Sequence, residues 1–147
     1  MDYLHSKITS TILKGFYAVC QALPFGLDKD VYRKALNIEL ELLELSVKEN
    51  VSYPIIYKEM NVGDIKVETV IDNSVGLILL NNATDITDQD ITNVRSIIKQ
   101  IPLEVILILN FGIEANHKRI FLGNDFKRHY KTDITDMTAQ DSINAYS

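Results

Sequence analysis

The chain has 147 residues, of which 46% are hydrophobic and 24% charged, and 15 Lys and Arg against 20 Asp and Glu give a net charge of -5. A chain of this size and composition is expected to form one globular domain with a core that needs neither disulfides nor a structural metal. The acidic balance disfavours a protein that coats nucleic acid through counterion release. The single Cys, the absence of a signal-peptide profile and the shortness of every apolar run lead us to expect a cytoplasmic protein without a membrane segment.

The first 45 residues predict two amphipathic helices. Apolar residues recur at steps of three and four over residues 6–23, so this stretch is expected to pack one side against a core. Cys20 lies beside that stripe and is interpreted as a small buried hydrophobe. After a break at residues 24–26, Asp28 or Asp30 is expected to cap a second helix. The residues predicted to face the core from this second helix are Val31, Ala35, Ile38, Leu42 and Leu45.

From Asn50 onward the pattern changes to strands. Residues 51–59 and 62–71 are rich in β-branched and aromatic residues and predict an antiparallel hairpin that turns at Met60-Asn61. Residues 75–80 and 105–109 are continuous apolar runs, which are typical of central strands covered on both faces.

The segment between these two runs predicts a crossover helix. Ile91, Val94 and Ile97 mark its apolar side, and Thr87 with Asp90 forms a capping box at its start. A last strand is expected near residues 119–122. The sequence therefore predicts an α+β fold with a mixed sheet flanked by helices. A single domain over residues 1–130 and a flexible tail over residues 131–147 are expected.

Three fragments of the chain resemble one known family. Residues 26–36 contain Gly26, Tyr32 and a following Lys-Ala-Leu at the spacing of its motif, residues 57–63 resemble its central hairpin, and residues 108–112 resemble its closing strand and turn. In order and spacing, over roughly residues 3–122, the chain resembles the small nuclease-like family named for its GxxExxY motif. That family belongs to the PD-(D/E)XK restriction-endonuclease-like superfamily. The resemblance implies a Mg²⁺ ion held by acidic side chains and a Lys that activates the attacking water.

Carried over position by position, the resemblance implies that this metal site has been lost. The Glu of the helix motif falls on Lys29, and the Asp of the first core strand falls on Glu68. The Glu-x-Lys pair falls on Ile78 and Leu80, and the Gln of the crossover helix falls on Asn93. We therefore expect a catalytically inactive relative without a bound metal, which acts as an interaction or regulatory module.

An alternative hypothesis keeps metal-dependent nuclease activity. In that case Mg²⁺ would be held by a rearranged acidic set. The candidate ligands for it are Asp28, Asp30, Glu68 and Asp72. A zinc site is not predicted, because the three His residues are isolated and there is no Cys pair.

A third hypothesis is nucleic-acid binding without cleavage. Residues 117–131 have a local charge of +4 and contain aromatic residues, which is a composition that can contact phosphate. The candidate contacts to phosphate or to an acidic partner are Lys118, Arg119, Lys127 and Arg128. The plainer interpretation is a charged edge strand and the segment that follows it, where Lys and Arg discourage aggregation. We expect a protein partner or a second copy of the chain, and favour nucleic acid less.

Overall fold

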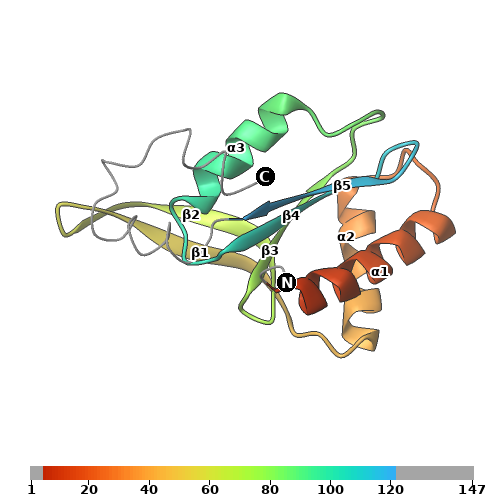
Figure 1. Ribbon diagram of the computed structural model, residues 1–147, viewed down its shortest axis with the longest axis horizontal. Helices are drawn as coiled ribbons and strands as arrows, with labels where there is room; N and C mark the ends of the chain where they lie inside the picture. The colour runs from red at the N-terminus through yellow and green to blue at the C-terminus, as the bar shows by residue number, and fades with distance from the viewer. Residues whose placement is uncertain (1–4, 122–147) are drawn as a thin grey trace.

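A five-stranded mixed sheet forms the centre of the computed structural model, which describes residues 5–121 (Figure 1). The elements in chain order are α1 (Ser6–Ala22), α2 (Lys29–Leu42), β1 (Val47–Tyr57), β2 (Met60–Ile71), β3 (Val75–Leu80), α3 (Asp88–Ile98), β4 (Val105–Asn110) and β5 (Asn116–Phe121). The strands lie in chain order across the sheet, and only β3 and β4 are parallel. This is the α+β architecture that the sequence predicts. No helix within residues 5–121 is long and apolar enough to cross a membrane.

Helices cover both faces of the sheet. Helices α1 and α2 pack on one face against residues that include Leu77 and Leu107, and α3 packs on the other face against residues that include Ile106 and Ile108. All six residues of β4 are buried, as expected for a central strand. The two apolar runs found in the sequence therefore form the parallel pair at the centre of the molecule, joined through α3.

Helix α1 uses the predicted face. Ile12, Phe16 and Val19 are buried in the core. Gly15 faces α2, and a Cβ atom there would lie 3.0 Å from the Leu40 Cδ2 atom, so the absence of a side chain lets the two helices approach. Cys20 is half-buried, and burial raises the pKa of its thiol to about 11. The thiol is therefore protonated at neutral pH, which fits its interpretation as a small hydrophobe.

Helix α2 begins where the sequence predicts, with Asp28 as its N-cap residue, although the Asp28 side chain makes no capping hydrogen bond. The predicted inner face is wrong. The α2 residues buried in the core are Tyr32, Leu36 and Leu40. Of the five residues predicted to face the core, two are half-buried and packed against it, and three are exposed. The half-buried members are Ala35 and Leu45, and the exposed members are Val31, Ile38 and Leu42. The error arose because α2 has two apolar faces, and periodicity cannot tell which one meets the sheet.

The β1–β2 hairpin also differs from the prediction. The chain turns at Lys58 and Glu59 rather than at Met60-Asn61, since Tyr57 and Met60 are the last cross-strand pair. Both turn residues have positive φ, 49° and 67°, as a two-residue turn that follows the twist of the strands requires. Asn and Gly adopt this conformation more readily, so the residue types Lys58 and Glu59 did not indicate a turn.

The crossover and the last strand agree more closely with expectation. The capping box of Thr87 and Asp90 is present at the start of α3, with the Asp90 amide 3.0 Å from the Thr87 hydroxyl. The hydrogen bonds that Asp90 accepts at this cap lower the pKa of its carboxyl. Strand β5 begins three residues before the expected stretch. The predicted tail, residues 131–147, lies outside the described residues.

Candidate functional site

Two of the positions singled out in the sequence meet at the start of α2. Lys29 is the first residue of α2, and its Nζ atom lies 3.0 Å from Oε2 of Glu68 on β2. The other carboxylate oxygen of Glu68 accepts a hydrogen bond from the backbone amide of Leu79 on β3, at 3.2 Å. The side chains of Lys29 and Glu68 are 45% and 33% exposed. Both oxygens of this carboxylate therefore already have partners from the chain itself.

The geometry of β2 explains why Glu68 is in this position. Val67 and Val70 both pack on the α3 side, although residues three apart in a regular strand point to opposite faces. The cross-strand ladder with β1 also lacks a pair between Glu68 and Asn50, whose φ is 54°. The β2–β3 ladder ends at the pair Thr69 and Leu77. The Leu79 amide lies beyond that last pair, and the Glu68 carboxylate satisfies it.

The other positions named by the resemblance are not gathered around this ion pair. Ile78 and Leu80 pack half-buried against the α3 side of the sheet, while Leu77 and Leu79 are buried on the side of α1 and α2. On either face, β3 therefore offers only aliphatic side chains. Asn93 is exposed on α3, where its side chain accepts a hydrogen bond from Gln89.

Gly26 and Tyr32 shape the loop that leads into Lys29. Gly26 has a φ of 106°, a conformation that favours glycine. The buried Tyr32 hydroxyl donates to the carbonyl of Pro24 and accepts from the amide of Leu27 at 3.2 Å. The Tyr32 ring stacks on Phe111 with a centroid distance of 4.6 Å. These contacts fix the α1–α2 loop on the sheet and so position the first turn of α2.

The remaining acidic candidates do not converge. Asp30 pairs with Arg33 and Lys34, and the hydrogen bonds from Arg33 and then Lys34 lower the pKa of its carboxyl. Asp72 lies in the turn between β2 and β3, where its carboxylate accepts from the amide of Ser46 at 2.7 Å. Within residues 5–121, no group of three or more His, Cys, Asp or Glu is arranged to hold a metal ion.

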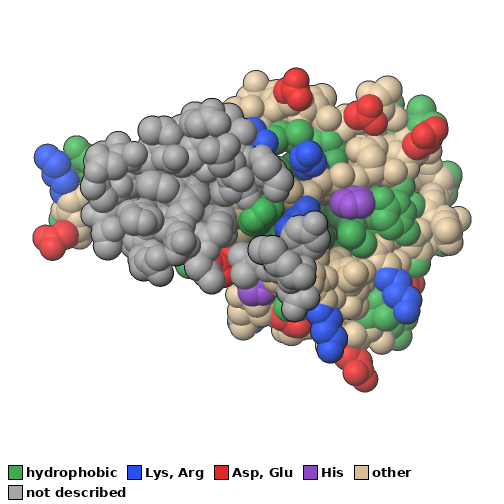
Figure 2. All heavy atoms as spheres, in the orientation of Figure 1, with side chains coloured by type: hydrophobic (Ala, Val, Ile, Leu, Met, Phe, Trp, Pro, Cys, Tyr) green, Lys and Arg blue, Asp and Glu red, His purple; other side chains and the backbone are tan. Residues whose placement is uncertain are grey.

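The basic candidates are described only in part. Lys118 and Arg119 are neighbours on β5 and so point to opposite sides of the strand. The guanidinium carbon of Arg119 lies 4.8 Å from the centroid of the Phe121 ring. On the face shown in Figure 2, basic side chains are spread from one end of the molecule to the other, with acidic side chains among them. Lys127 and Arg128 lie outside the described residues.

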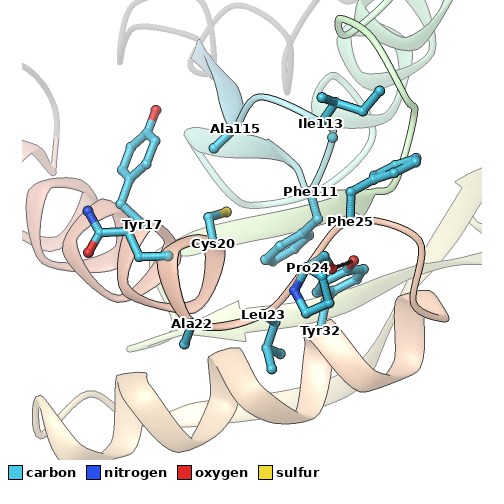
Figure 3. Close-up of a pocket in the computed structure, with 12 residues that line it drawn as sticks. Tyr17, Cys20, Ala22, Leu23, Pro24, Phe25, Tyr32, Phe111, Ile113 and Ala115 are labelled. Atoms are coloured by element: carbon cyan, nitrogen blue, oxygen red, sulfur yellow. Dashed lines mark hydrogen bonds between the residues drawn. The ribbon is translucent and has the colours of Figure 1, made fainter.

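A pocket of about 590 Å³ was not predicted from the sequence. It lies between the end of α1, the α1–α2 loop and the β4–β5 loop, and Figure 3 shows Phe25, Phe111 and Ile113 among its lining residues. At its rim the Tyr17 hydroxyl lies 2.8 Å from the His117 Nδ1 atom, and burial lowers the pKa of His117. The lining residues come from distant segments and share no spacing, so no local pattern could have revealed the pocket.

The fold is of the α+β class, with a five-stranded mixed sheet and three helices within residues 5–121. Comparison with known families matches residues 6–120 to the PD-(D/E)XK nuclease superfamily. The match spans nearly all the described structure, including Lys29 and Glu68, and the chain belongs to this superfamily. No curated protein and no solved structure matches the chain.

Proposed function

We propose that this member of the superfamily does not cleave nucleic acid and acts as an interaction or regulatory module. The observation that supports the proposal is the contact between Lys29 and Glu68, 3.0 Å apart. Here the positive charge beside the carboxylate belongs to the chain itself. A side-chain ammonium can neutralise a carboxylate, but it can neither polarise a phosphate as a divalent ion does nor generate a metal-bound hydroxide.

The residues present do not fit a divalent metal. Mg²⁺ takes six oxygen ligands in near-octahedral geometry. The site offers one carboxylate, whose oxygens bond to Lys29 and to the Leu79 amide, and its neighbours on β3 are aliphatic. A cation placed beside Glu68 would also be repelled by the ammonium of Lys29. These contacts support the proposal that the site is degenerate, as the resemblance implies.

We also propose that the chain is a divergent relative of the GxxExxY family. Gly26 and Tyr32 occupy the outer positions of that motif, and Lys29 stands in place of its Glu. The support is that Gly26 and Tyr32 shape the loop before α2, a role that needs no metal. The geometry of this loop can therefore be kept when the Glu of the motif is lost. A module that binds a partner through its shape needs only the loop geometry.

The test is to melt the full chain with and without MgCl₂ or MnCl₂ and to assay cleavage of DNA and RNA. A metal that binds only the native state raises the melting temperature. We expect no rise and no cleavage for the wild type. A rise that is abolished by Glu68→Gln, together with metal-dependent cleavage, would establish the alternative of an active nuclease.

A pair of matched variants sharpens this test. Lys29→Glu supplies a second carboxylate beside Glu68 and is expected to show a rise in melting temperature with Mn²⁺. Lys29→Gln removes the ammonium without adding a ligand and is expected to show a much smaller response. Equal responses from the two variants would mean that Lys29 does not stand at a ligand position.

A further inference from the structure

Beside the row that meets the core, helix α2 has a second apolar stripe. This outer stripe consists of the exposed Val31, Ile38 and Leu42 and of Ala35, which is half-buried and also packs against the core. Val31, Ile38 and Leu42 are 43%, 59% and 73% exposed. The steps of four, three and four residues are those of the contact positions in a coiled coil. Single exposed apolar residues are common on protein surfaces, but a continuous row along one helix is typical of an interaction site.

The exposed members of the outer stripe are not required by the core. The other side of α2 already packs on the sheet through Tyr32, Leu36 and Leu40. After Leu42 the helix ends, and the amide of Leu45 bonds to the carbonyl of Leu40 at 3.0 Å. This bond turns the chain back toward the core and sets the end of the outer stripe at Leu42.

Two exposed residues of opposite charge flank the outer stripe on one side. Lys34 and Glu41 are seven residues apart, so they occupy equivalent positions beside it. The Lys34 ammonium lies 3.3 Å from Asp30, and its side chain is 70% exposed, so this surface ion pair is weak and the ammonium can exchange partners. Glu41 is exposed and is the second-last residue of the helix.

We propose that the outer stripe binds the same stripe of a second copy of this chain, with the two α2 helices antiparallel about a twofold axis. In that register Ile38 of each copy faces Ala35 of the other, and Val31 faces Leu42. Large residues thus meet small or medium ones and can interdigitate. Lys34 of each copy then faces Glu41 of the other, so the twofold axis makes the charge pair twice. The self-complementary charges favour a second copy over an unrelated partner.

The size of the outer stripe sets the strength of the dimer. The helix has 14 residues, and a single helix pair of that length buries less than the ~800 Å² per partner of a standard interface. We therefore expect a reversible dimer that dissociates on dilution. This inference rests on the proposed function, for which it names a partner. Its test uses neither metal nor nucleic acid, so its failure would leave the non-catalytic proposal standing.

The test is analytical ultracentrifugation of the full chain from ~1 μM to ~1 mM, which spans weak and moderate dissociation constants. The wild type is expected to pass from monomer to dimer over this range. Lys34→Glu and Glu41→Lys each create two like-charge contacts across the axis and are expected to weaken the dimer at least ~10-fold. The double variant carrying both changes restores opposite charges and is expected to regain the dimer.

Further variants keep this test decisive. Ile38→Ser should weaken the dimer without touching the charges, and Lys34→Gln should weaken it less than Lys34→Glu. The melting temperature of each variant confirms that it is folded. A wild type that stays monomeric at ~1 mM overturns the proposal. Single charge variants that dimerise like the wild type, or a double variant that fails to recover, also overturn it.

Discussion

The two long faces of α2 have similar composition and different surroundings. The inner face carries Tyr32, Leu36 and Leu40, each at most 2% exposed, whereas Ile38 and Leu42 on the outer stripe are more than half exposed. The two faces differ in their neighbours. On the inner face, Leu40 packs close to Gly15 of α1, and Tyr32 stacks on Phe111, which follows β4. An apolar row on a helix therefore predicts a contact, but only the neighbouring elements decide whether that contact lies within the chain.

Truncation of the inner face gives the largest expected effect. Leu36→Ala removes a fully buried side chain and should lower the free energy of unfolding by about 2–5 kcal/mol. Ile38→Ala is the matched change on the outer stripe and should alter it by no more than about 0.5 kcal/mol in dilute monomer. Urea denaturation of both variants measures the difference. Similar losses at the two positions would contradict the assignment of the faces.

The contact between α1 and the inner face of α2 gives the next effect. Gly15→Val inserts a branched side chain where even a Cβ atom would meet Leu40 at 3.0 Å. Overpacking of this kind should cost about 1–3 kcal/mol. Ser10→Val, an exposed position on the same helix, is the control and should stay close to the wild type. If both variants unfold at the same urea concentration, α1 does not pack on α2 through Gly15.

A smaller effect is expected from the one polar group of the inner face. Tyr32→Phe keeps the stacked ring and removes the hydroxyl that bonds to Pro24 and Leu27. Its loss should lower the free energy of unfolding by about 1 kcal/mol. Tyr57→Phe removes a hydroxyl from a side chain that is 62% exposed and should have no measurable effect. Thermal melting compares the two, and an unchanged Tyr32→Phe variant would mean that these bonds do not hold the loop.

The smallest effect on stability is expected at the start of α2, where the ion pair of Lys29 and Glu68 lies. Lys29→Gln breaks a contact between two partly exposed side chains, and such pairs contribute less than about 1 kcal/mol. Urea denaturation at low and at high salt measures this contribution, which should shrink as salt rises. A loss as large as that of Leu36→Ala would mean that Lys29 supports the fold itself, contrary to our interpretation of it as a replaced ligand.

Sequence reasoning succeeded where local chemistry decides the structure. Strands β3 and β4 were predicted from continuous apolar runs, and the start of α3 from Thr87 and Asp90, because each signal lies within its own element. The inner face of α2 was not predicted, since it depends on Phe111 and Gly15 far away in the sequence. The turn at Lys58-Glu59 was missed because the twist of the paired strands, rather than residue preference, imposes its positive φ values.

For the candidate site, the sequence named residues but not the contacts that they make. The resemblance singled out Lys29 and Glu68, but a bond between them could not be foreseen. That contact needs the interruption of the β1–β2 ladder at Asn50 and Glu68, and an amide on β3 beyond the end of the β2–β3 ladder. The alternation of strand faces also could not place Ile78 and Leu80 relative to Glu68, because it is interrupted at that residue.

The claim that an ammonium has replaced the metal can be tested most directly by adding Mn²⁺ to the isotope-labelled full chain and recording amide NMR spectra. Mn²⁺ is paramagnetic and broadens the signals of amides close to where it binds. The account predicts that the amides of Lys29, Glu68 and Leu79 stay as sharp as those of α3. Selective broadening of these three signals at substoichiometric Mn²⁺, abolished by Glu68→Gln, would contradict it.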